Sequence, residues 1–368
     1  RQPEDPLAVP GDLIVRGVES ITLRGPGTGL PGETDIYAQV GHSTMISGLT
    51  ATGDIDVSSE GQVRVGASDY GENGFAQIGH GGAVRAGPTT LSGNISVYGG
   101  DNVRVAGGDE TDDRCYAQIG HGGAGYDGDM SGSIRVEAGQ ALYLETGWTR
   151  SDSHVGHGGR EVQGLLSGDI TVEAPMIEME AHSSDALIGH GALDGSSKGD
   201  RQGHIYVQGD LVAKEDEYAI GERTGDWWIG HRTGNGVIEE ADVALVLGHL
   251  RSYDAVPNPG ESVSVNTEEF ADMLVQNLRG GALTLVATGE EDMDIHVPLN
   301  MSPQVCSNDL SFLSVNDLNF NASVQKNGTG DINVVAGWME PHGLSKPADL
   351  TNPTDPLFDM DALLATGP

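Results

Sequence analysis

The sequence predicts an all-β protein, a parallel β-helix (β-solenoid) with three short strands per coil and roughly eight to nine coils. The first observation is a recurring segment, Tyr-Ala-Gln-Ile-Gly-His-Gly-Gly at 116–123, with near or weaker copies elsewhere. Its histidines lie 38, 41, 36, 33 and 41 residues apart, at His42, His80, His121, His157, His190 and His231. A period of this length is typical of stacked repeats.

The second observation is a strand signal that recurs in step with the histidines. A glycine and a polar residue precede alternating apolar positions, as in Gly53-Asp54-Ile55-Asp56-Val57. Equivalent segments begin at Gly11, Gly53, Gly93, Gly132, Gly168 and Gly203, which are 42, 40, 39, 36 and 35 residues apart. Isoleucine and valine at alternate positions indicate a strand with one buried face.

The remaining strands of each coil follow from the same pattern. A second strand comes after a tight turn, as at Gln62-Val63-Arg64-Val65, and the Ile-Gly-His segment is the third. We expect each strand to pair with its equivalent one coil away, at about 4.8 Å. The composition agrees, because 56 glycines and 37% hydrophobic residues among 368 are lean for a conventional globular core.

The chain divides into four predicted parts. Residues 1–10 are an N-terminal extension, and 11–250 form the β-helix with Ile-Gly-His-Gly repeats. The run Val243–His249 comes 18 residues after His231 and is interpreted as out of phase. Residues 251–338 continue as two or three shorter coils, and 339–368 are a Pro- and Asp-rich tail. A short helix is expected near 267–278, with Thr267 as its N-cap and Gly280 and Gly281 at its end.

Two C-terminal segments carry a family resemblance. Residues 277–289, Asn-Leu-Arg-Gly-Gly-Ala-Leu-Thr-Leu-Val-Ala-Thr-Gly, and 330–337, Gly-Asp-Ile-Asn-Val-Val-Ala-Gly, resemble the repeats of filamentous-haemagglutinin-type secreted exoproteins. The Tyr-Ala-Gln-Ile-Gly-His-Gly-Gly unit is similar to segments of very large bacterial surface proteins of that kind. The resemblance covers roughly residues 11–338. It implies a right-handed coil, an extracellular or cell-surface location, and a structural or adhesive role.

The six repeat histidines are the first candidate site. Alternation places each histidine on the same face as the buried isoleucine, so we expect an inward column, with Gln39, Gln77 and Gln118 pointing outward. The favoured interpretation is a structural ladder whose ring nitrogens bond to one another or to corner carbonyls. A metal column is the alternative, although carboxylate or thiolate partners are missing. Six equivalent histidines do not resemble one catalytic site.

The acidic residues are the second candidate. The net charge is −36, from 55 acidic and 19 basic residues, which argues against nucleic acid as a partner. Asp109, Glu110, Asp112 and Asp113 form a cluster of hard oxygen ligands suited to calcium (Ca2+), with a solvated acidic face as the alternative. No apolar run approaches the roughly 20 residues of a membrane span.

Enzymatic function is not expected. Acidic residues are spread over many loops, and lysine occurs only at 198, 214, 326 and 346, so no catalytic constellation stands out. Trp148, Trp227 and Trp228 suit either a sugar platform or packing at a coil edge. The sequence favours a non-enzymatic extracellular structural element, a subunit of a surface filament or matrix fibre. The alternatives are a monomeric adhesin or glycan-binding module, and a polysaccharide-processing enzyme.

The chain ends predict self-assembly. Terminal coils leave open strand edges. The opening Arg1-Gln2-Pro3, with neither an initiator Met nor a signal segment, indicates a mature or processed fragment. Beyond a Pro-rich linker, Leu357, Phe358, Leu363 and Leu364 are candidates for contact with a neighbouring copy, or for a cap on the chain's own last coil. Cys115 and Cys306 are expected about five coils, or roughly 24 Å, apart, which is too far for a disulfide.

Overall fold

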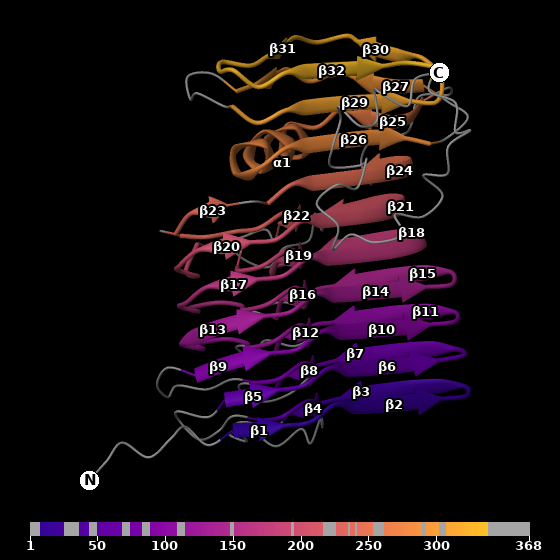
Figure 1. The fold of residues 1–368 in the computed structure, drawn as a ribbon. Coiled ribbons are helices and arrows are strands. Elements are labelled where there is room, and N and C mark those ends of the chain that lie inside the picture. The colour runs from indigo at the N-terminus through magenta and orange to yellow at the C-terminus, as the bar shows by residue number, and fades with distance from the viewer. Residues whose placement is uncertain are drawn as a thin grey trace.

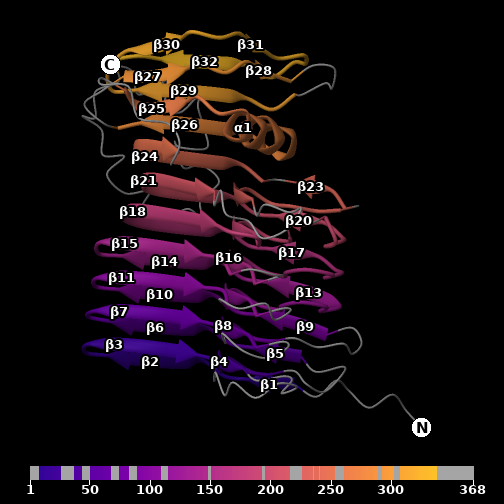
Figure 2. The same ribbon diagram turned by 180° about the vertical axis from the view of Figure 1, so that it is seen from behind.

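The computed structural model is all-β, a stack of parallel strands with one short helix (Figures 1 and 2). The structure describes residues 8–25, 37–43, 50–67, 74–82, 89–108, 115–147, 151–192, 195–215, 226–234, 236–239, 241–252, 261–288, 292–301 and 307–337. The colour climbs from indigo at one end to yellow at the other, so each coil rests on the coil before it. The predicted parallel β-solenoid is confirmed.

Each regular coil contains four strands, and the sequence predicted three. The strand that was missed forms a seven-stranded sheet of its own. This first ladder consists of β1 (Ala8–Pro10), β5 (Thr50–Thr52), β9 (Thr89–Ser92), β13 (Gly128–Ser131), β17 (Leu166–Ser167), β20 (Arg201–Gln202) and β23 (Ile238–Glu239). Its strands are only two to four residues long and mostly polar, so they lack the alternation that identifies a strand.

The other three strands of each coil lie where the sequence placed them. The second ladder consists of β2 (Leu13–Gly17), β6 (Ile55–Ser59), β10 (Ile95–Gly99), β14 (Ile134–Ala138), β18 (Ile170–Ala181), β21 (Ile205–Glu215), β24 (Val243–Ser252), β26 (Leu283–Ala287), β29 (Leu310–Ser314) and β32 (Ile332–Val335). The third ladder begins with β3 (Ser20–Arg24), β7 (Gln62–Gly66), β11 (Asn102–Ala106) and β15 (Ala141–Glu145), passes through the second halves of β18, β21 and β24, and ends with β25 (Glu261–Val265), β27 (Asp292–Ile295) and β30 (Leu318–Phe320). The fourth ladder is the six-stranded sheet of β4 (Ala38–Val40), β8 (Ala76–Ile78), β12 (Ala117–Ile119), β16 (Ser153–Val155), β19 (Ala186–Ile188) and β22 (Trp227–Ile229).

The predicted number of coils is wrong. The fourth ladder ends at β22, so the regular part amounts to about five turns. Above it, strands of the second ladder pair at spacings of 40, 27 and 22 residues, from Val243 to Leu283, Leu310 and Ile332. These coils lack an Ile-Gly-His strand, and the helix or the short strands β28 (Leu299–Asn300) and β31 (Val324–Gln325) take up part of the turn.

The run Val243–His249 is in phase with the strand series. Val243 pairs with Ile205 and Leu245 with Val207, in the same register as the earlier strands of the second ladder. The histidine series stops at His231, and that series had suggested a break. The coil therefore continues on the second and third ladders after the fourth has ended.

The interior is filled from alternate positions of the long strands. In β10, Ile95, Val97 and Gly99 are buried while Ser96 and Tyr98 are exposed. The main core gathers such residues from the second, third and fourth ladders. A separate small core lies at the first ladder, made of Ala51, Leu91, Tyr126, Met130, Val162 and Leu166. The fourth ladder therefore lies between the main core and the small core, and it has buried side chains on both of its faces.

The glycine of each Ile-Gly-His segment lies at a close approach between coils. Gly79 has φ +156°, and a Cβ built there would lie 1.9 Å from the carbonyl oxygen of Gly120. No side chain fits at that distance, and the positive φ also favours glycine. The fixed glycine before each histidine follows from this contact.

The helix α1 (Glu268–Gly280) forms where the sequence predicted it. Thr267 caps its first turn by accepting a hydrogen bond from the N–H of Phe270, and Glu268 and Glu269 suit the positive end of the helix dipole. Its apolar face is buried against the coil beneath, directly above β22 and β23 in the stack (Figure 1). Among the described residues, no helix has the length and apolar character that crossing a bilayer requires.

Candidate functional site

The six repeat histidines lie in one column inside the solenoid. Successive rings stack with centroids 4.6 to 4.9 Å apart and planes within 11° of parallel. This distance equals the separation of strands in a sheet, about 4.8 Å, so each coil contributes one ring. His80, His121, His157 and His190 are fully buried, and His42 in the first coil is partly exposed.

Each buried imidazole holds two backbone groups. The Nδ1 atom of His80 accepts the backbone N–H of His42 at 3.0 Å, and its Nε2 donates to the carbonyl oxygen of Gly53 at 2.9 Å. The same pair of bonds recurs at His121, His157, His190 and His231. A backbone N–H can only donate, so Nδ1 must carry a lone pair and Nε2 the proton. The geometry therefore selects one neutral tautomer throughout the column.

Burial keeps these rings neutral. It lowers the pKa of His157 and of His231 to about 4, and the hydrogen bond from Nε2 to a glycine carbonyl only partly offsets this. The pKa values of His121 and His190 fall well below the ordinary value, first through burial and then through repulsion from the neighbouring rings. A proton on Nδ1 would also break the bond to the preceding coil.

The column does not fit a metal ion. Metal binding to imidazole needs a free nitrogen lone pair, and in the buried rings Nδ1 is occupied by an N–H while Nε2 carries the proton. Within the described part of the chain, no three His, Cys, Asp or Glu residues come together in an arrangement that would hold a metal. The chemistry of this donor set supports the structural ladder.

The glutamines before each isoleucine lie inside, and the prediction that they point outward is wrong. Gln77 and Gln118 are fully buried, and Gln39 in the first coil is half-buried and donates to the carbonyl oxygen of Gly79 at 2.8 Å. The amide nitrogen of Gln77 donates to the carbonyl oxygens of Gly120 at 2.7 Å and Gly122 at 2.6 Å in the next coil. The alternation rule assumed solvent on the second face of the strand, where the first ladder and its small core lie instead.

His154 continues the glutamine column. It pairs in register with Gln118, and its Nε2 lies 2.6 Å from the carbonyl oxygen of Gly189. Burial lowers its pKa to about 4. Side chains of both columns of the fourth ladder thus bind glycine carbonyl oxygens of a neighbouring segment. They give these buried carbonyls a hydrogen-bond partner in addition to strand pairing.

An aromatic stack and an ion cluster share one further column. Tyr37, Phe75 and Tyr116 stack with centroids 4.8 and 5.2 Å apart, and burial raises the pKa of Tyr116. In the following coils the equivalent positions are Asp152 and Asp185. The guanidinium of Arg160, which is itself buried, donates to both carboxylates, at 2.5 and 2.7 Å to Asp152 and 3.2 Å to Asp185.

The helix α1 closes the fourth ladder. Met273 Sδ lies 3.3 Å from the backbone nitrogen of Ile229, and the amide of Asn277 donates to the carbonyl oxygen of Ile229 at 2.6 Å. These two side chains take the place of the next strand. They were not singled out from the sequence; the available signal was a predicted helix about one repeat period after His231, where the next Ile-Gly-His strand would fall.

The tryptophans lie beneath this helix and do not form an exposed sugar platform. Trp227 is 9% exposed and stacks on Phe270, at 5.9 Å between centroids. Trp228 is 8% exposed and lies under the guanidinium of Arg232, at 4.3 Å. Packing at the coil edge, the second interpretation of the tryptophan cluster, describes both. Trp148 lies outside the described residues.

Apolar side chains are exposed at both ends of the stack. Phe320, Ile332 and Val334 of the last coil are 42%, 41% and 49% exposed, and the inward-facing Leu13 and Val15 of the first coil are only half-buried. Ile14, which is 68% exposed, points outward like its register partner Asp56, and Val18, 73% exposed, lies in the turn after β2. In the described part of the chain only two other large hydrophobics are exposed, Tyr98 and Val237. Large apolar side chains normally avoid such exposure in clusters. The two ends of the stack are therefore the described surfaces best suited to a partner.

Several predicted site residues lie outside the described residues. Asp109, Glu110, Asp112 and Asp113 belong to 109–114, and Leu357, Phe358, Leu363 and Leu364 belong to 338–368. Cys306 lies in 302–306, while Cys115 is buried. The calcium site, the contacts of the tail and the absence of a disulfide stay predictions.

No family model, curated protein or solved structure matches this chain.

Proposed function

We propose that the chain is a non-enzymatic extracellular structural β-solenoid that stacks end to end into a surface filament or matrix fibre. The observation that carries the proposal is the exposed apolar surface at the two ends of an otherwise continuous ladder. Right-handed winding and secretion are part of the proposal, and the resemblance to filamentous-haemagglutinin-type exoproteins supports them.

The interior supports a structural role. Its polar side chains bind backbone groups of neighbouring segments, as His80 binds the N–H of His42 and the carbonyl of Gly53. Such bonds fix the register of the coils and leave no ring nitrogen in the buried column for a substrate.

The two ends are complementary in kind. The second ladder begins with β2 and ends with β32, so a second copy placed on top continues the same ladder. Leu13 and Val15 occupy the inward positions of β2 and are only half-buried, and the exposed Ile332 and Val334 occupy the inward positions of β32. The first coil also presents Nδ1 of His42, which accepts no hydrogen bond from the described residues. A head-to-tail contact of this kind does not close on itself and builds a filament.

Charge sets the conditions for assembly. A net charge of −36 opposes association, and dissolved salt or calcium weakens that repulsion. We expect assembly to strengthen as salt or calcium rises. The tail residues Leu357 and Phe358, in the part that the structure does not describe, would add to the contact with a neighbouring copy.

Light scattering after size exclusion, together with negative-stain electron microscopy, tests this proposal. Wild-type protein is expected to form filaments whose length grows with protein concentration and salt. Ile332→Lys and Val15→Lys, which place a charge at inward positions of the last and first coils, should each prevent growth, and Val237→Lys, which changes an exposed valine away from both ends, should not. A wild-type chain that stays monomeric at high concentration and salt contradicts the proposal.

The second candidate function is a monomeric ligand-binding module, the adhesin alternative. The observation that favours it is a hollow lined by arginines on the third ladder.

A further inference from the structure

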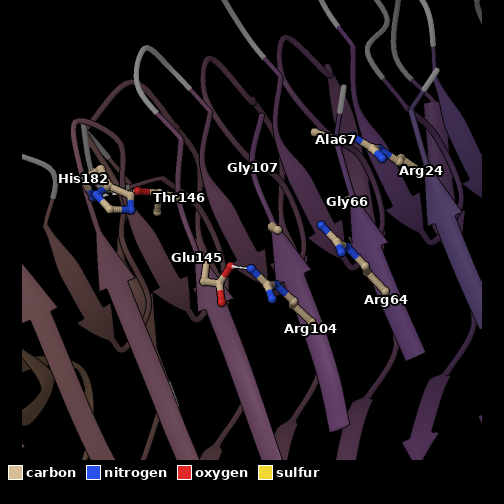
Figure 3. A pocket seen from close by; sticks show the side chains of 10 residues that line it. Arg24, Arg64, Gly66, Ala67, Arg104, Gly107, Glu145, Thr146 and His182 are labelled. Atoms are coloured by element: carbon tan, nitrogen blue, oxygen red, sulfur yellow. Dashed lines mark hydrogen bonds and ion pairs between the residues drawn. The ribbon is translucent and has the colours of Figure 1, made fainter. Parts of the chain in front are cut away.

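Three arginines of consecutive coils line one hollow on the outer face of the third ladder (Figure 3). Arg24 ends β3, Arg64 lies on β7 and Arg104 on β11, and the hollow has a volume of about 80 Å³. Its remaining lining residues are Gly66, Ala67, Ala106, Gly107, Glu145, Thr146 and His182. In a chain with 19 basic and 55 acidic residues, three guanidiniums around one small hollow are notable.

Ion pairs on this face follow a diagonal rule. Arg104 and Ala106 pair in register with Tyr143 and Glu145 of the next coil. The guanidinium of Arg104 donates to the carboxylate of Glu145, one coil up and two residues along. Glu178 and Lys214 repeat this geometry. Glu180 is the register partner of Lys214, so Lys214 lies one coil up and two residues along from Glu178. The Lys214 ammonium donates to the Glu178 carboxylate at 2.6 Å.

Arg64 is the position at which the diagonal rule fails. It pairs in register with Arg104, and Gly66 pairs with Ala106, so Ala106 stands on the diagonal of Arg64. Alanine offers no carboxylate there. The Nε atom of Arg64 is buried without a hydrogen-bond partner, and no ion pair joins Arg64 to any described residue. The equivalent place in the next coil is filled by Glu145.

An oxyanion fits the place that Ala106 leaves open. A guanidinium stays charged at every physiological pH and presents a planar set of donors that matches a carboxylate in two-point contact. Arg24, the register partner of Gly66, lines the same hollow from the preceding coil. The only acidic side chain among the described residues that line the hollow, Glu145, is bound to Arg104. A polymer with many negative charges would be repelled by the rest of this acidic chain, so a small ligand fits better.

We propose that Arg64, with Arg24 lining the same hollow, binds the carboxylate of a small ligand, of the class that includes uronic-acid sugars and dicarboxylic acids, in the place where this coil has Ala106 and the next coil has Glu145. The ligand carboxylate repeats the contact that Glu145 makes with Arg104. This proposal does not depend on end-to-end assembly, since the hollow lies on the side of the stack.

Isothermal titration calorimetry of the full chain tests the proposal with digalacturonate as the carboxylate probe. Separate titrations use sodium sulfate, sodium phosphate and the neutral disaccharide maltose. Digalacturonate is expected to bind, and Arg64→Gln should weaken it by about tenfold or more, the usual worth of a hydrogen bond to a charged group. Arg16→Gln, which removes an exposed arginine paired with Asp56 on another face, should leave the affinity unchanged.

Ala106→Glu is the sharper variant, because it removes no arginine. Its carboxylate should occupy the place beside Arg64, abolish digalacturonate binding and raise the melting temperature. Circular dichroism shows whether each variant is folded. The proposal is overturned if digalacturonate does not bind to wild-type protein, if Arg64→Gln binds it as well as wild type, or if Ala106→Glu still binds it. Equal binding of sulfate or phosphate would reduce the hollow to a general inorganic-anion site and would also contradict the proposal.

Discussion

The backbone N–H of His121 donates to Nδ1 of His157 at 3.0 Å, from one coil to the next. The bond forms only while Nδ1 of His157 keeps its lone pair, so the protonation state of the ring and the stacking of the two coils are linked. Repeated through the column, the link makes the solenoid depend on neutral imidazoles.

Acid should unfold the protein through these rings. The folded pKa of His157 and of His231 is about 4, and the unfolded value is about 6.5, so the unfolded chain binds more protons as pH falls. Their contribution to stability is complete above about pH 6.5 and decreases as pH falls toward 4. Through this difference in pKa, each of the two rings contributes about 3 kcal/mol to the free energy of unfolding above pH 6.5.

Melting temperatures measured by circular dichroism between pH 7.5 and 4.5 test the linkage. The decline should begin between pH 6.5 and 5.5, above the range in which most carboxylates titrate. A melting temperature that stays constant down to pH 5 would exclude a neutral buried ladder.

His121→Phe should be strongly destabilising although it keeps an aromatic ring in the stack. Phenylalanine cannot accept the N–H of His80 or donate to the carbonyl of Gly93, which leaves two buried backbone groups unsatisfied. The expected loss is about 2 to 6 kcal/mol in urea unfolding. His42→Phe is the matched control: it lies in the first coil and makes one such bond, to Gly11, so its cost should be smaller.

Gly53→Ala and Gly11→Ala form a matched pair. Both glycines have positive φ, +138° and +150° respectively, and begin equivalent strands. A Cβ on Gly53 would lie 2.1 Å from the carbonyl oxygen of Gly11, whereas a Cβ on Gly11 meets nothing within 4 Å. Gly53→Ala should therefore lower the unfolding free energy much more than Gly11→Ala. Equal losses would mean that backbone strain, common to both, and not the contact between coils, requires glycine here.

Asn277→Ala should loosen the top of the fourth ladder. It removes the hydrogen bond to the carbonyl oxygen of Ile229 and leaves that group buried without a partner, at a cost of about 1 to 3 kcal/mol. Hydrogen exchange followed by mass spectrometry should speed up at β22 and β19 and stay unchanged at β6. Gln276→Ala, which removes only the contact with Arg232, is the control. A uniform change along the stack would show that α1 does not act as a local cap.

The repeat made much of the fold predictable. Period and alternation predict that Ile55 and Val57 lie inside and that the histidines form one column, and the capping residues predict the helix after Thr267. These features depend on local pattern, which sequence displays directly. The stacking at fixed register then follows from the near identity of successive coils.

The predictions that were wrong depend on contacts between ladders and between coils, which no local sequence pattern contains. Gln77 was assigned to solvent because its strand alternates, yet the first ladder covers that face. The first ladder itself was missed because strands such as β5, Thr50–Thr52, are short and polar. Counted from the histidine series, Val243 is out of phase, but counted from the strand series it is in phase, because its register partner is Ile205. The place left open beside Arg64 appears only once coils are aligned in register.

Long-range proton–nitrogen NMR of the histidine side chains is the most direct test of the central claim, that neutral imidazoles hold the coils together. The account predicts that the five rings from His80 to His231 in the column carry their proton on Nε2 and keep Nδ1 unprotonated at pH 7, and that they stay so at pH 5.5. Rings protonated on Nδ1, or charged at pH 5.5 in the folded protein, would contradict it.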